Sequence, residues 1–153
     1  MKITDFLDSD MVIPNLKGGS KAEVIEEMAQ WLSRSLPHLN AQKLVQVLLE
    51  REKIGSTAIG EGVAIPHGKL AGIDKVLGVF GRSAAGVDFA SVDGCPTHLF
   101  FLLVAPENSP GDHLKALARI SRILQSASFR TRLMQAGSAA ELFNAIEEED
   151  ARV

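Results

Sequence analysis

The sequence predicts an α/β protein, built as a three-layer α/β/α sandwich with a mixed β-sheet between helical layers. Segments with helical periodicity alternate with short apolar runs, and several helices follow one another at the end of the chain. The run His98 to Val104, HLFFLLV, is almost wholly apolar, as expected for a central strand that is covered on both faces. With 153 residues, of which 46% are hydrophobic and 23% charged, we expect a single domain over residues 1–153 with its own core.

Proline and capping residues mark the first elements. Met11 to Ile13 predicts a short strand that ends at Pro14. Ser20 and Glu23 have the spacing of a capping box, which predicts the start of a helix that ends before Pro37. The apolar face of this helix should lie on the sheet, and it consists of Ala22, Ile25, Ala29, Leu32 and Leu36.

A second helix is predicted over about residues 41–53, with Asn40 as its N-cap. Its buried stripe continues into Arg51, so an arginine takes the next place on an apolar face. Arg51 either extends past the end of the core into solvent or reaches a site that begins four residues later. Spacing alone leaves both alternatives open. The apolar residues that precede Arg51 on the stripe are Ala41, Leu44 and Leu48.

Residues 55–70, GSTAIGEGVAIPHGKL, form the most informative stretch of the chain. Val63 to Ile65 predicts a short buried strand, and Pro66 should end its pairing because proline has no N–H to donate. His67 would then be the first residue presented beyond the strand end. Gly68 permits an unusual φ and lets backbone amides approach a ligand closely.

His67 has the chemistry of a phosphoryl-accepting nucleophile. An imidazole is a competent nucleophile near neutral pH when one ring nitrogen is unprotonated and the other is held by an acceptor. Ser56 and Thr57 supply hydroxyl donors, which would stabilise the charge on a transferring phosphoryl group. The alternative is a structural histidine that is hydrogen-bonded near a strand end.

A second histidine begins a later helix. Ser109, Pro110 and Asp112 predict an N-cap, a first helical residue and an S-x-x-D capping box. His113 then falls in the first turn, where free amides and a partial positive charge favour an anion. Its side chain should point inward, either to support His67 or only to pack at the end of the apolar face of this helix. The residues that share its face of the helix are Leu117, Ile120 and Leu124.

The remaining elements are a strand, a short helix and a last helix. Val76 to Arg82 alternates apolar residues with glycine and predicts a strand. A short helix is expected over residues 127–135, and Ser138 with Glu141 predicts the start of the last one. The acidic residues 147–150 should form a solvated end of that helix.

Composition and missing motifs exclude several classes of function. The net charge of −3 does not suggest the basic surface that binding to nucleic acid requires. No apolar run approaches the roughly 20 residues that span a bilayer. The start of the chain lacks the pattern of a signal peptide, and one cysteine, Cys95, cannot form an internal disulfide, so we expect a cytoplasmic protein. The glycine spacing around Gly62 and Gly68 differs from that of a P-loop, and no metal-binding motif occurs.

The stretch GSTAIGEGVAIPHGKL resembles the phosphorylation-site signature of enzyme IIA domains of the bacterial phosphotransferase system, in the fructose, mannitol and nitrogen-regulatory family. The E-R-E run at residues 50–52 and the segment AP-x-x-x-x-x-x-HL, which ends at Leu114, also match this family. The resemblance covers essentially the whole chain and implies the same fold. It implies that His67 accepts the phosphoryl group, that His113 supports it and that Arg51 lies on the phosphate side. The candidate phosphate-binding residues are thus Arg51, Ser56, Thr57 and Gly68.

The resemblance also implies partners and leaves alternatives. The donor would be the phosphohistidine of a small carrier, HPr or its nitrogen-branch counterpart (NPr), with no metal or nucleotide cofactor. The nitrogen-regulatory branch is favoured because no IIB domain, IIC membrane segment or fused carrier accompanies the chain, and transporters or sensor kinases are then expected targets. One alternative is a sugar-specific IIA that passes phosphate to a IIB domain. Another is a regulatory binding protein that keeps the fold without turnover.

The chain departs from the commonest signature at two positions. Ala58 stands where glycine is frequent, and Glu61 stands where asparagine or glycine is frequent. Both departures leave the histidine intact. Glu61 would put a negative charge near the phosphate and tune its affinity.

Overall fold

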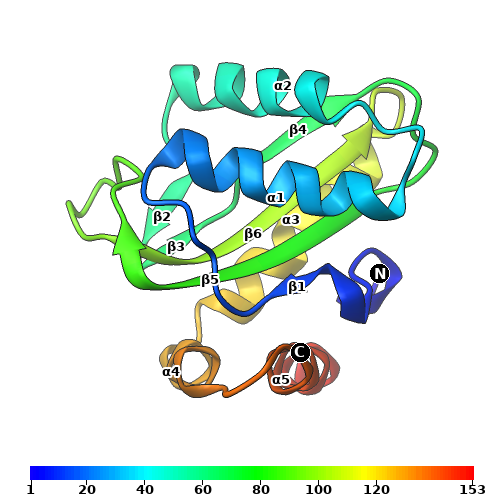
Figure 1. Ribbon diagram of the computed structural model, residues 1–153. Coiled ribbons are helices and arrows are strands. Elements are labelled where there is room, and N and C mark those ends of the chain that lie inside the picture. The colour runs from blue at the N-terminus through cyan, green and yellow to red at the C-terminus, as the bar shows by residue number, and fades with distance from the viewer.

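A six-stranded mixed sheet forms the middle of the protein in the computed structural model, which describes residues 1–153 (Figure 1). The long central strand β6 runs antiparallel to β5 and parallel to β3 and β4, while β1 is parallel to β5 and β2 antiparallel to β3. The predicted apolar run lies in β6, as expected for a strand covered on both faces. The strands are β1 Val12–Ile13, β2 Ala58–Gly60, β3 Val63–Ala64, β4 His67–Leu70, β5 Leu77–Val87 and β6 Thr97–Pro106.

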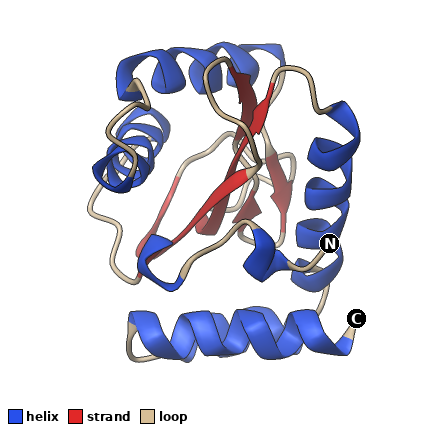
Figure 2. Cartoon of the chain, turned by 90° about the vertical axis from the view of Figure 1, so that its right-hand side faces the viewer, coloured by secondary structure: helices blue, strands red, loops and turns tan.

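Helices cover both faces of this sheet, which confirms the predicted α/β/α layers. In Figure 1, α1 and α2 lie on the near and upper side of the sheet and α3 lies behind it, with α4 and α5 below. Figure 2 shows the same layers from the side, with the sheet in the middle. The helices are α1 Lys21–Ser35, α2 Ala41–Ile54, α3 Pro110–Leu124, α4 Ala127–Gln135 and α5 Ala139–Arg152. No helix combines the length and the apolar character that crossing a membrane would require.

Side-chain N-caps are present at the starts of two helices that the sequence predicted. Ser20 and Ser138 each accept a hydrogen bond from the backbone N–H three residues later, which satisfies a free donor of the first turn. Ser109 occupies the N-cap of α3, with Pro110 as the first helical residue, but its side chain caps no N–H. The capping box predicted there is therefore wrong, and the carbonyl of Ser109 instead accepts from the N–H of His113 at 3.2 Å.

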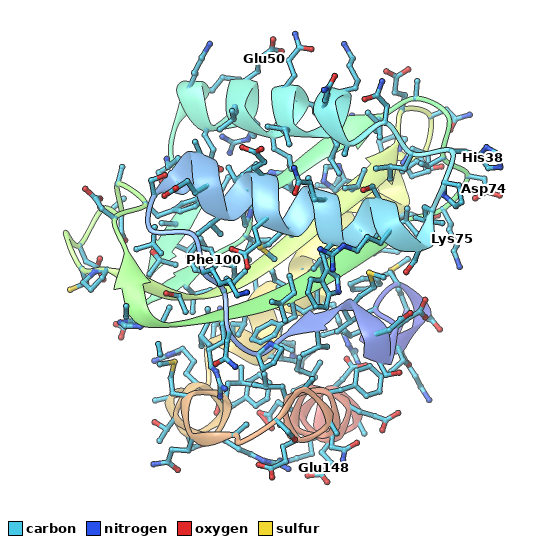
Figure 3. The ribbon with its side chains drawn as sticks, in the orientation of Figure 1. His38, Glu50, Asp74, Lys75, Phe100 and Glu148 are labelled. Carbon is cyan, nitrogen blue, oxygen red and sulfur yellow. The ribbon has the colours of Figure 1, made fainter.

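The interior is one continuous cluster of buried hydrophobic side chains. Phe100 of β6 is fully buried within it, whereas His38, Glu50 and Glu148 project outward from the surface (Figure 3). His38 is thus a solvated loop residue between α1 and α2. Trp31 packs at the edge of the core, and its indole N–H donates to the carbonyl of Asp10 at 2.8 Å.

The strand that carries His67 does not end at Pro66. Val63 pairs with Leu99 and His67 pairs with Leu103, so β3 and β4 keep one register along β6 through the proline. The carbonyl of Pro66 accepts from the N–H of Leu103 at 2.9 Å. The expectation that pairing stops here is wrong because proline lacks only its N–H, and its carbonyl still joins the ladder. His67 is therefore the first residue of β4.

Two acidic residues at the end of α5 are buried, although the sequence predicted that residues 147–150 are solvated. Glu149 and Asp150 lie on the inner face of the helix, while Glu147 and Glu148 are exposed. The carboxylate of Asp150 accepts from the N–H of Ile3 at 2.8 Å and from Nε of Arg119 at 2.5 Å. Asp150 therefore joins the N-terminal segment to α3 and α5. Helical periodicity brings it onto the face of Ile146, one turn earlier.

Asp150→Asn is expected to lower the free energy of unfolding by about 2–3 kcal/mol, because it leaves the partly buried Arg119 without its counter-charge. Urea denaturation followed by circular dichroism measures this change. The matched control is Glu147→Gln on the exposed face of the same helix, which should change stability by less than about 0.5 kcal/mol. Equal urea midpoints for the two variants would contradict the anchoring role of Asp150.

Candidate functional site

The ring of His67 is half-buried, and one of its nitrogens is held by the protein. Nδ1 lies 2.7 Å from the carbonyl oxygen of Ile65, two residues earlier. A carbonyl oxygen can only accept, so Nδ1 must carry the hydrogen of this bond. In the neutral ring, Nε2 is then unprotonated and keeps its lone pair. His67 is therefore held in the tautomer that a nucleophile at Nε2 requires.

A second imidazole faces His67 from the first turn of α3. The ring centroids of His67 and His113 are 5.5 Å apart, and the planes meet at 67°, an edge-to-face arrangement. The strand β4 and the helix α3 lie against β6, which brings the two residues together. The inward direction predicted for His113 is confirmed, since only 8% of its surface is exposed.

Nε2 of His113 is buried and has no hydrogen-bond partner. An unpaired buried polar atom costs free energy, so it marks a place where a ligand atom can supply the missing bond. Burial lowers the pKa of His113 below its ordinary value, and the nearby charges of His67 and Lys69 lower it further. The free protein thus keeps His113 neutral around neutral pH.

Titration of His113 by ¹H–¹⁵N NMR should give a midpoint below 6.5, the ordinary value for histidine. Between the lowered pKa and about pH 6.5 the unfolded chain binds more protons than the folded one, so stability should fall as the pH decreases through this window. Lys69→Gln should raise the midpoint, because it removes one positive charge near the ring. A midpoint at or above 6.5 in the folded protein would contradict this account.

Gly68 serves packing, and its predicted unusual φ is wrong. The glycines with positive φ are found elsewhere, at Gly60, Gly62, Gly72, Gly86 and Gly94. A Cβ on Gly68 would come within 2.7 Å of Cγ1 of Val47 in α2. The absence of a side chain therefore lets α2 approach the sheet. Because strand residues alternate in direction, His67 and Lys69 point to the opposite face from Gly68, toward α3.

The hydroxyls of Ser56 and Thr57 are engaged with protein acceptors. Oγ of Ser56 donates to the carbonyl of Phe89 at 2.5 Å. The hydroxyl of Thr57, whose residue is 4% exposed, donates to the carboxylate of Glu52. Both residues were expected to donate to a phosphoryl group; in this structure their hydroxyl hydrogens are used in these bonds to the protein.

Arg51 closes the end of its own helix. Its Nη1 donates to the carbonyl of Gly55 at 2.8 Å, and the side chain is half-buried. Val47, one turn earlier on the same face of α2, packs at Gly68, and Lys43 and Leu70 line a common pocket. The helix thus runs antiparallel to β4, and its C-terminal end with Arg51 lies toward the His67 end of the strand. Of the five N–H donors of the guanidinium, the bond to Gly55 uses one.

Glu61 does not lie beside His67, although its negative charge was expected near the phosphate. It occupies the turn between β2 and β3 with a positive φ of 57°, and its carboxylate lies 3.6 Å from Nη2 of Arg130 in α4. Val63 and His67 pair with residues four positions apart on β6, roughly 13 Å at the rise of a strand, and Glu61 lies beyond Val63. The sequence prediction did not include β2, and this hairpin turns Glu61 toward α4.

Sequence reasoning missed two residues that belong to the surroundings of His67. Lys69 shares the face of His67 and acts on His113, and strand alternation would have identified it had residues 67–70 been predicted as a strand. Glu52 is buried at the end of α2 and binds Thr57, and the sequence carried no signal for this role beyond its place in the E-R-E run. No group of three or more His, Cys, Asp or Glu side chains is arranged to hold a metal ion.

Comparisons with known proteins identify the family. The family described as "Phosphoenolpyruvate-dependent sugar phosphotransferase system, EIIA 2" matches residues 5–149. A nitrogen regulatory protein from Bradyrhizobium diazoefficiens is 42% identical over 146 residues, which cover 95% of each chain. The fructose-specific EIIABC component of Bacillus subtilis is 38% identical over 98% of this chain, which corresponds to 24% of that larger protein.

A solved structure has the same fold. The nitrogen regulatory protein IIA-Ntr from Neisseria meningitidis superposes with a TM-score of 0.87 and is 36% identical, with 94% of this chain and 98% of that chain covered. The resemblance that the signature around His67 indicated is thus confirmed over nearly the whole length. This chain belongs to the EIIA 2 family of the phosphoenolpyruvate-dependent sugar phosphotransferase system.

Proposed function

We propose that this chain, a member of a family of phosphotransfer proteins, is a phosphoryl relay and regulatory protein in which His67 accepts phosphate from an HPr-type histidine phosphocarrier. The observation that carries the proposal is the hydrogen bond from Nδ1 of His67 to Ile65, since it leaves Nε2 free to react. In the transfer, Nε2 forms a bond to phosphorus while the N–P bond of the carrier's phosphohistidine breaks. The carrier's ring nitrogen recovers its electron pair.

His113 supports this step as a hydrogen-bond partner of the transferring group. Its Nε2 is buried, unpaired and on a ring 5.5 Å from that of His67. A phosphoryl group on His67 carries about two negative charges, which raise the affinity of a neighbouring imidazole for a proton. His113 can then take up a proton and donate to a phosphoryl oxygen. Lys69 adds positive charge on the same face.

Arg51 is proposed to contribute to phosphate binding from the end of α2. Its donors beyond the bond to Gly55 remain free, and a guanidinium matches the geometry of phosphate oxygens. The bond to Gly55 limits the motion of the side chain. Arg51 would therefore approach the phosphoryl group from the edge of the sheet, opposite to His113.

We favour a role in the nitrogen-regulatory branch. The phosphoryl donor would be the carrier of that branch, and the target would be a transporter or a sensor kinase in the cytoplasm. Two nitrogen regulatory proteins, which are 42% and 36% identical to this chain, match it along 95% of their own length. A sugar-specific role is the second candidate. It is favoured by the 38% identity to part of the fructose-specific EIIABC component, and it requires that phosphate pass from His67 to a IIB domain.

Incubation with a phosphorylated carrier tests the proposal. Mass spectrometry should find one acid-labile phosphate per chain, and ³¹P NMR should report a phosphohistidine substituted at Nε2. Transfer onward to a purified fructose-type IIB domain would identify the sugar-specific role, whereas its absence would favour the regulatory one. Binding to the carrier without any phosphate transfer would refute the relay and support a regulatory binding protein.

A further inference from the structure

A buried carboxylate lies at the start of a chain of hydrogen bonds that leads to His67. Glu52 is 8% exposed in the last turn of α2. Its Oε1 accepts from the N–H of Thr57 at 3.1 Å and from Nζ of Lys21 at 3.0 Å, and its Oε2 accepts from the hydroxyl of Thr57. Glu52 thus holds both the backbone and the side chain of Thr57 in one orientation.

The hydrogen bonds continue from Thr57 to the reactive ring. The carbonyl of Thr57 accepts from the N–H of Ile65 at 3.0 Å. The carbonyl of Ile65 accepts from Nδ1 of His67 at 2.7 Å. Since the orientation of Ile65 depends on its neighbour Thr57, the acceptor that selects the tautomer of His67 is held by a carboxylate outside β4.

Lys21 provides the counter-charge for this buried acid. Its ammonium is paired with Glu52 and also lies 4.7 Å from the ring centroid of Phe89. It comes from the first residue of α1, so the network joins α1, α2 and the segment before β2. Without such a partner the buried carboxylate would carry an uncompensated charge, which is unfavourable in the interior.

We propose that Glu52, held by Lys21, is a positioning residue for phosphoryl transfer, which acts through Thr57 and Ile65 to keep His67 in the tautomer with a free Nε2. The expected effect of Glu52 on the rate of phosphoryl transfer rests on the proposed function. Its expected effect on the tautomer of His67 does not, because the tautomer is a property of the unphosphorylated protein. Nothing in the residue types alone links position 52 to position 67, since fourteen residues lie between them in the chain.

The tautomer of His67 can be read directly from long-range ¹H–¹⁵N NMR of the imidazole ring. The wild type should show a protonated Nδ1 and an unprotonated Nε2. In Glu52→Ala we expect a mixture of tautomers, as in a freely hydrated histidine, together with a rate of transfer from the phosphorylated carrier that is about 10- to 100-fold lower. Glu52→Gln keeps an acceptor for the Thr57 amide and should restore most of the wild-type tautomer and rate.

Two further variants separate positioning from a general loss of stability. Asp150→Asn is expected to destabilise the fold at the other side of the molecule, and it should leave the tautomer of His67 unchanged. Thr57→Val removes the hydroxyl of the network alone and should shift the tautomer in the same direction as Glu52→Ala. It provides the test if Glu52→Ala does not fold.

The outcomes distinguish this inference from the proposed function. If a folded Glu52→Ala, or Thr57→Val in its place, keeps the wild-type tautomer and transfer rate, the positioning role is overturned. If the tautomer shifts but the wild type accepts no phosphate, Glu52 positions the ring as inferred and the phosphoryl relay is the part that fails.

Discussion

Replacing His67 by alanine is expected to abolish phosphorylation by the carrier. The side chain supplies the nucleophile, and its Nε2 is the ring nitrogen left unprotonated when Nδ1 donates to Ile65. His113, the neighbouring imidazole, is not expected to take over as acceptor, because its Nε2 is buried. The measurement is the acid-labile phosphate per chain after incubation with phosphorylated carrier, and we expect none above background.

His38→Ala provides the matched control for this variant. His38 is exposed in the loop before α2 and should be phosphorylated to no measurable extent, so its removal should leave the incorporation of phosphate unchanged. Phosphate on any residue in His67→Ala would show that the acceptor lies elsewhere. Loss of phosphorylation in His38→Ala would likewise contradict the assignment of His67 as the only acceptor.

His113→Ala is expected to lower the rate of phosphoryl transfer to His67 by about 10²- to 10³-fold, the usual cost of removing one donor to a developing negative charge. The ring of His113 is the group that the structure places 5.5 Å from the His67 ring, with its Nε2 free of any protein partner. Rapid-mixing kinetics with the phosphorylated carrier measure the rate of this step.

His113→Gln separates hydrogen bonding from proton uptake. A glutamine amide can donate to a phosphoryl oxygen but does not titrate, so this variant should recover part of the rate and lose the dependence on the pKa of His113. Circular dichroism must show that both variants are folded, since His113 is buried. A rate within twofold of the wild type in His113→Ala would remove this residue from the site.

The helices and the central strand could be predicted because their signals are local. The cap at Ser20, the proline at the start of α3 and the apolar stripe through Ile120 depend on residues within a few turns of one another. The same holds for β6, whose long apolar run needs no partner to be recognised. The order of these elements was enough to predict the three layers.

The strands β2 and β4 could not be predicted in the same way. Each has only three or four residues, and each is defined by pairing with a strand elsewhere in the chain. The buried position of Asp150 was missed for a related reason. Its hydrogen-bond partners Ile3 and Arg119 lie 147 and 31 residues away, so no local pattern shows that they bind the carboxylate.

For the candidate site, the sequence by itself determined which residues can do the chemistry: an imidazole at His67, a second one at the start of α3 and the family signature around them. Only the tertiary structure decided which of them meet and in what state. It brought His113 to His67, engaged Ser56 and Thr57 elsewhere, and joined Glu52 to the carbonyl that fixes the tautomer. The reason is physical: reactivity belongs to residue type, whereas burial and hydrogen-bond partners come from segments that are distant along the chain.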